Sequence, residues 1–188
     1  MIRKLSKYIP NTLTLTRAVL VIPFAYLLNL YLSNNTGYPK LLAIFVLIAV
    51  TDILDGCIAR KLDAATELGA LLDVAADSLF AIIATIVLFK AGIVCFEYLL
   101  IMISKLAEFF ITSQMLKGNS CKKKNLVFDF LGKMSGILFI AFPMIACTFL
   151  RIDIMSQVLI RIGIISIATI SLLSFIHRIR LIHQLRQA

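Results

Sequence analysis

The chain has 188 residues, of which 61% are hydrophobic, with a mean hydropathy of +0.98 and a formal net charge of +9. This composition excludes an ordinary water-soluble domain. It also argues against nucleic-acid binding in spite of the positive charge, because nucleic-acid recognition needs a soluble reading surface that such a chain lacks.

The hydrophobic residues fall in six long segments, at about 12–32, 40–60, 65–89, 93–116, 130–150 and 154–177. Each is long enough to cross a bilayer core of about 30 Å, which needs roughly 20 helical residues. Turn-forming residues separate them, with Ser33 to Pro39 after the first segment and Lys117 to Ser120 after the fourth. An open sheet would leave backbone groups unpaired in hydrocarbon. We therefore predict an all-α, six-span membrane protein, with residues 1–188 forming a single domain.

The distribution of basic residues predicts the orientation of these spans. If the N-terminus is cytoplasmic, that side carries twelve Lys and Arg residues outside the spans, and the opposite side carries only Lys40, Lys90 and Arg151. Basic residues accumulate on the cytoplasmic side of membrane proteins. We predict that both termini face the cytoplasm.

Acidic residues are concentrated in one place. Six of the ten lie between positions 52 and 77, and four of these, Asp52, Asp55, Asp73 and Asp77, belong to apolar segments. A carboxylate inside a span is costly unless it is paired or binds a metal, so this cluster marks a functional site. Lys105 and Glu108, in the fourth span, have the spacing of a helical ion pair instead.

The spacing of the four aspartates brings them together. Asp52 and Asp55 share one face of the second span, and Asp73 and Asp77 share one face of the third. The short connection makes the two helices antiparallel neighbours, so the carboxylates converge near the cytoplasmic boundary. They would repel one another, and Arg60 is the only counter-charge that we expect nearby. Oxygen ligands favour Mg²⁺ or Mn²⁺, and two such ions would balance four carboxylates and could act in displacement at phosphorus.

Small and basic residues lie on the same helix faces as the aspartates. Gly56 follows Asp52 by four residues and precedes Arg60 by four, which suits a nucleotide phosphate. Gly69 precedes Asp73 by four and permits close approach of a helix or ligand. Taken singly, such a glycine is usually a packing residue and such an arginine an interfacial anchor.

The region resembles the CDP-alcohol phosphatidyltransferases, whose signature reads D-x2-D-G-x2-A-R-x8-G-x3-D-x3-D. All fixed positions match, at Asp52, Asp55, Gly56, Ala59, Arg60, Gly69, Asp73 and Asp77. The resemblance implies that Asp52, Asp55 and Asp73 bind metal and that Asp77 is both a metal ligand and the general base. It also implies that Asp55, Gly56, Ala59, Arg60 and Gly69 lie against the CDP moiety of a CDP-linked lipid, from which a phosphatidyl group passes to an alcohol while CMP leaves.

Two flanking segments resemble the family more weakly. Asn11 and Thr14, followed by Arg17, resemble the entry to the first span, where polar groups approach the nucleotide, although both could be helix caps. Lys133 resembles a residue that binds a phosphorylated acceptor, although it could be a lysine reaching to the membrane interface. The resemblance further implies a homodimer in a bacterial cytoplasmic membrane, with the active site facing the cytoplasm.

The acceptor and two rival classes stay open at this point. Glycerol 3-phosphate is favoured, and inositol phosphate, serine or another lipid's glycerol headgroup are the alternatives. The motif reads Asp73-Val-Ala-Ala-Asp77-Ser78, where phosphatidylglycerophosphate synthase-like members read D-P-x-A-D-K. An ion-coupled transporter would explain the carboxylates but not Gly56 and Arg60. A membrane prenyltransferase would need two separated Asp-rich motifs and more spans.

Overall fold

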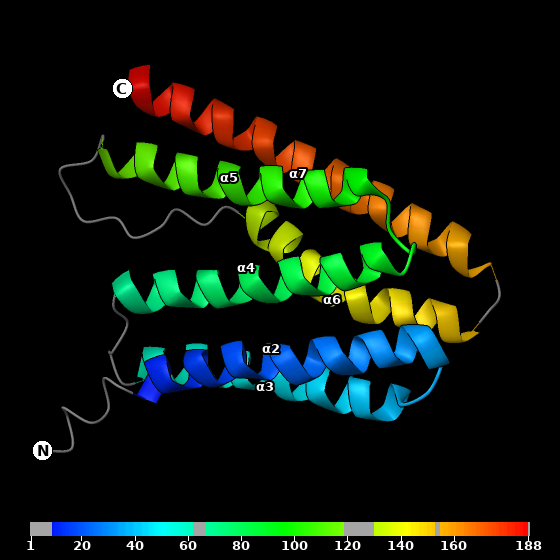
Figure 1. Ribbon diagram of the computed structural model, residues 1–188. Coiled ribbons are helices and arrows are strands. Elements are labelled where there is room, and N and C mark those ends of the chain that lie inside the picture. Colours follow the sequence, from blue (N-terminus) through cyan, green and yellow to red (C-terminus); the bar gives the residue numbers. More distant parts are fainter. Residues whose placement is uncertain (1–8, 62–66, 119–129, 153–154, 188) are drawn as a thin grey trace, which may run out of the picture. The chain divides into compact units, whose positions relative to one another are not determined.

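The computed structural model describes residues 9–61, 67–118, 130–152 and 155–187. Six helices occupy these residues (Figure 1). They are α2 (Ile9–Asn34), α3 (Tyr38–Lys61), α4 (Glu67–Lys90), α5 (Phe96–Gly118), α6 (Phe130–Ile152) and α7 (Ser156–Gln187). No strand occurs in these ranges, which confirms the all-α prediction. Each apolar segment has become one helix, and the polar segments lie between them.

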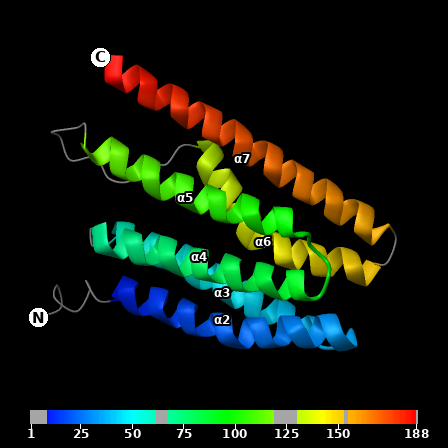
Figure 2. The same cartoon turned by 45° about the horizontal axis from the view of Figure 1, so that its top comes forward.

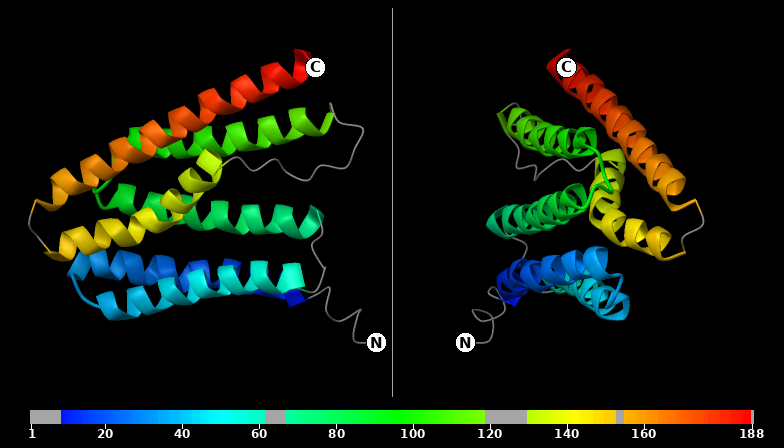
Figure 3. Two further views of the ribbon diagram at one scale, coloured as in Figure 1. Left: turned by 180° about the vertical axis from the view of Figure 1, so that it is seen from behind. Right: turned by 45° about the vertical axis from the view of Figure 1, so that its right-hand side comes forward.

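The chain divides into two compact units, Met1–Gly92 and Ile93–Ala188. In the first unit, α2 packs against both α3 and α4. Figures 1 and 2 show that α2 and α4 run in the same direction and α3 in the opposite one. The start of α2, the end of α3 and the start of α4 therefore lie at one end of this unit. In the second unit, α7 packs against α6 and α5 (Figure 3).

A tight turn joins α2 to α3. Asn35 and Gly37 have positive φ angles of 54° and 83°, a conformation that Asn and Gly adopt more readily than other residues. The Gly37 carbonyl accepts hydrogen bonds from the backbone N–H groups of Lys40 and Leu41. The predicted break between the first two spans is thus confirmed, but it is shorter than Ser33 to Pro39, since only residues 35–37 lie outside the helices.

Three phenylalanine rings join the helices of the first unit. Phe24 of α2 lies 4.7 Å from Phe80 of α4, and Phe45 of α3 lies 6.3 Å from each, measured between ring centroids. Rings at these separations stabilise packing beyond the apolar area that they bury. Phe80 is one turn beyond Asp77, so this aromatic cluster packs the middle of α4, next to Asp77, against α2 and α3.

Polar and apolar side chains are distributed as expected for a protein in lipid. Large apolar side chains are exposed, Ile22 by 71% and Leu15 by 67%, while Arg17, Lys105, Glu108 and Arg178 are buried. In water-soluble proteins, by contrast, charged residues are mostly exposed. Four helical segments are long and apolar enough to cross a membrane: Thr14–Asn34, Leu71–Lys90, Met134–Ile152 and Ser156–Arg180. Six spans with both termini in the cytoplasm stay a prediction.

The packing of the second unit predicts that two glycines will differ in how well they tolerate substitution by alanine. Tyr98 of α5 stacks near Phe139 and Phe142 of α6, at centroid distances of 5.7 and 4.8 Å. A Cβ atom on Gly163 of α7 would lie 3.1 Å from the Phe142 ring, whereas one on Gly136 would meet nothing within 4 Å. Because Phe142 is buried, it cannot easily move aside.

We therefore expect Gly163→Ala to destabilise the protein by about 1–3 kcal/mol, the usual cost of overpacking a core. Gly136→Ala is the matched control and should be neutral or stabilise by up to about 1 kcal/mol, since alanine favours the helix. Thermal unfolding of both variants in detergent, followed by circular dichroism, measures the difference. Equal midpoints would show that the second unit is not packed at Gly163 as described.

Candidate active site

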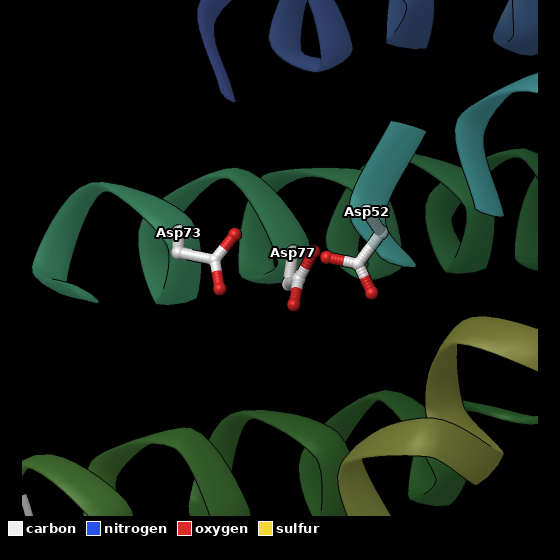
Figure 4. Close-up of side chains that lie close together, drawn as sticks. All are labelled: Asp52, Asp73 and Asp77. Atoms are coloured by element: carbon white, nitrogen blue, oxygen red, sulfur yellow. The ribbon is translucent and has the colours of Figure 1, made fainter. Parts of the chain in front are cut away.

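Three of the four predicted metal ligands converge in the first unit. One carboxylate oxygen each from Asp52 of α3 and from Asp73 and Asp77 of α4 lie within 4.8 Å of one another. Figure 4 shows Asp52 reaching across from α3 toward Asp77, with Asp73 one turn away along α4. The i,i+4 spacing places the two α4 residues on one face. The predicted convergence of carboxylates is confirmed for these three residues, but α3 and α4 are not the close packing partners that we expected, because both pack mainly against α2.

A buried arginine from α2 binds all three carboxylates. Arg17 Nη1 lies 2.8 Å from Asp73 Oδ1 and 2.9 Å from Asp77 Oδ1, and donates a hydrogen bond to each. Its Nη2 atom lies 2.8 Å from Asp52 Oδ1. The planar guanidinium presents several N–H donors in a fixed fork. One side chain therefore links the three helices of the first unit.

This contact corrects the expectation that Arg60 is the only counter-charge nearby. Arg17, which we did not expect there, is in direct contact with three of the carboxylates, while the side chain of Arg60 lies outside the described part of the chain. The sequence did contain a signal, because an arginine within an apolar segment is costly without a partner. Its separation from Asp73 and Asp77, 56 and 60 residues, concealed which partner it has.

The carboxylates and the arginine differ sharply in exposure. The Arg17 side chain is 1% exposed, whereas those of Asp52, Asp73 and Asp77 are 45%, 44% and 32% exposed. The guanidinium thus lies on the protein side of the cluster, and the carboxylates remain accessible from the other side. Three carboxylates and one guanidinium carry a formal charge of −2. Such a set of oxygen donors fits a hard divalent cation.

The other predicted site residues fall into two groups. Thr14 is buried, one turn before Arg17 on α2, and Gly69 lies half-buried on α4, one turn before Asp73. The remaining predicted residues lie on helices, but their side chains are outside the described part of the chain: Asn11 on α2, Asp55, Gly56, Ala59 and Arg60 on α3, and Lys133 on α6.

Comparison with known proteins agrees with this arrangement. A family model described as CDP-alcohol phosphatidyltransferase matches residues 7–175. The chain belongs to the CDP-alcohol phosphatidyltransferase family. The match includes Arg17 and the whole of the signature from Asp52 to Asp77, and it extends across both compact units of this CDP-alcohol phosphatidyltransferase.

Curated relatives of this CDP-alcohol phosphatidyltransferase include proteins with two different names. A CDP-diacylglycerol–glycerol-3-phosphate 3-phosphatidyltransferase of Pseudomonas fluorescens is 42% identical over 80 residues, 43% of this chain and 40% of the relative. The protein of the same name in Rickettsia prowazekii (strain Madrid E) is 39% identical over 87 residues, 46% of this chain and 47% of the relative. A putative cardiolipin synthase of Mycobacterium bovis is 36% identical over 97 residues, which are 52% of this chain and 44% of the relative. The chain thus matches less than half the length of each relative.

Proposed function

We propose that this protein transfers a phosphatidyl group from a CDP-linked lipid, CDP-diacylglycerol, to an alcohol acceptor and releases CMP. The observation that carries this proposal is the convergence of Asp52, Asp73 and Asp77, three fixed positions of the family signature, across α3 and α4. Glycerol 3-phosphate is the proposed acceptor, since it appears in the names of two of the relatives. The role is then in phospholipid biosynthesis.

The proposed cofactor is a pair of Mg²⁺ or Mn²⁺ ions, held by Asp52, Asp55, Asp73 and Asp77. When bound, they would stabilise negative charge on the diphosphate oxygens. Asp77 accepts the proton of the acceptor hydroxyl. The hydroxyl oxygen bonds to the lipid-bearing phosphorus, and the bond from that phosphorus to the oxygen bridging the two phosphates breaks. CMP leaves with that oxygen, and no covalent enzyme intermediate forms.

The remaining signature residues are proposed to hold the nucleotide. Gly56, Ala59 and Gly69 would let the CDP moiety approach the helix backbones closely, and Arg60 would pair with its phosphate. Asn11, Thr14 and Asp55 would contribute polar contacts. Lys133 would bind the phosphate of the acceptor.

The cellular setting is proposed as well. The four apolar helical segments support an integral membrane protein, and the named relatives are bacterial. We place it in a bacterial cytoplasmic membrane as a single six-span domain, with the active site facing the cytoplasm. The proposed assembly is a homodimer.

A second acceptor class is supported by a specific observation. The putative cardiolipin synthase of Mycobacterium bovis aligns with a larger share of this chain than the other two relatives, 52% against 43% and 46%. The serine after Asp77 also departs from the D-P-x-A-D-K form of the phosphatidylglycerophosphate synthase-like members. The glycerol headgroup of phosphatidylglycerol is therefore the second candidate acceptor.

One assay tests both candidates. The purified protein is incubated with radiolabelled CDP-diacylglycerol and Mn²⁺ or Mg²⁺, and CMP release is followed with glycerol 3-phosphate, phosphatidylglycerol, inositol phosphate or serine. We expect release with glycerol 3-phosphate and its loss when EDTA removes the metal. CMP release with phosphatidylglycerol but with no other acceptor would show that the second candidate acceptor is the correct one. If none of the acceptors produced CMP, the transferase function would be wrong.

A further inference from the structure

We infer that Arg17 is a buried positioning residue that holds the metal-binding carboxylates together and lowers their affinity for divalent cations. The first support is its contact pattern. Its Nη1 atom contacts both carboxylates of α4, and its Nη2 atom contacts the carboxylate of α3. The inference rests on the proposed metal site, but not on the proposed reaction.

The second support is the position of the charge. Arg17 is fully buried on the inner side of the cluster, and each carboxylate keeps between 32% and 45% of its surface exposed. A cation bound from the exposed side therefore shares the same carboxylates with a positive charge beneath them. The positive charge of Arg17 repels this cation and so weakens its binding.

The third support is that this charge is permanent. A guanidinium is not deprotonated in proteins, so it neutralises part of the repulsion among the carboxylates whether or not a metal is bound. Without it, the three described carboxylates would carry a charge of −3 instead of −2. The affinity of oxygen-ligand sites for divalent cations rises with the number of charged ligands.

Removing the charge should therefore have two linked effects. Without metal, Arg17→Gln leaves the carboxylates to repel one another, so the variant should be less stable than the wild type. With metal, the divalent ion supplies the missing positive charge. Because a ligand that binds the folded state stabilises it, the rise in unfolding temperature caused by metal should be larger in Arg17→Gln than in the wild type.

The test measures binding of Mn²⁺ alone to the full-length protein in detergent by calorimetry, together with the unfolding temperature with and without Mn²⁺. We expect Arg17→Gln to bind Mn²⁺ at least about 10-fold more tightly, in line with the added net negative charge. Arg17→Lys keeps the charge and should bind like the wild type. Arg161→Gln, which removes an exposed charge from α7, should also leave binding unchanged.

The other possible results of these measurements would either overturn or support the inference. Weaker Mn²⁺ binding by Arg17→Gln would overturn the inference, because Arg17 would then only organise the ligands. A variant that unfolds equally with and without Mn²⁺ would overturn it too, whereas recovery of folded Arg17→Gln only in the presence of Mn²⁺ would support it. If the wild type binds no Mn²⁺, the proposed metal site itself is wrong.

Discussion

Asp77→Asn is expected to lower the rate of CMP release by about 10²–10⁴-fold, the usual contribution of a general acid or base. Asparagine has nearly the same shape as aspartate but cannot accept the proton of the acceptor hydroxyl. The side chain is the least exposed of the three carboxylates, at 32%. Arg17 keeps its contacts with Asp52 and Asp73 in this variant, so the fold and part of the CDP-lipid binding should persist.

Comparison with Asp73→Asn separates the base from a metal ligand. Loss of a ligand weakens metal binding, which a higher Mn²⁺ concentration can overcome, but loss of the base cannot be overcome in this way. We expect excess Mn²⁺ to restore part of the activity of Asp73→Asn and little of that of Asp77→Asn. Glu97→Gln, the same chemical change at an exposed position on α5, is the control. Full activity of Asp77→Asn in excess Mn²⁺ would remove Asp77 from the base role.

Most of the fold could be predicted from the sequence because the signals are local. Apolar runs of about 20 residues define the helices, and the segment from Ser33 to Pro39 contains the turn that the structure shows at residues 35–37. The aspartate cluster was predictable for the same reason, since spacings of three and four residues place side chains on one face of a helix. The confirmed ion pair between Lys105 and Glu108 follows the same rule.

The role of Arg17 could not be predicted because it depends on how helices are rotated against one another. The side chains that pack α2 against α3 and α4, among them Phe24, Phe45 and Phe80, are apolar like most of α2. Their pattern does not indicate which face of α2 meets α3 and α4. An arginine among them shows only that some partner exists.

A buried charge cluster in the second unit gives the largest expected effect on stability. Glu108 of α5 lies between two cations, with Oε2 2.8 Å from Lys105 Nζ and Oε1 3.8 Å from Nε of Arg178 on α7. All three side chains are at most 10% exposed. The Arg178 guanidinium also lies 5.3 Å from the centre of the Phe109 ring, so Arg178 connects α7 to α5 through two contacts.

Glu108→Gln should therefore destabilise the protein by about 3–5 kcal/mol, the usual cost of removing one partner from a buried ion pair. The amide would face two buried cations without a negative charge of its own. Lys105→Gln is the matched variant and should cost less, because Glu108 keeps its contact with Arg178. The unfolding temperatures of both variants in detergent, followed by circular dichroism, test this order. If Lys105→Gln were the more harmful change, Glu108 would not be the centre of the cluster, and the contact between α5 and α7 would depend on apolar packing instead.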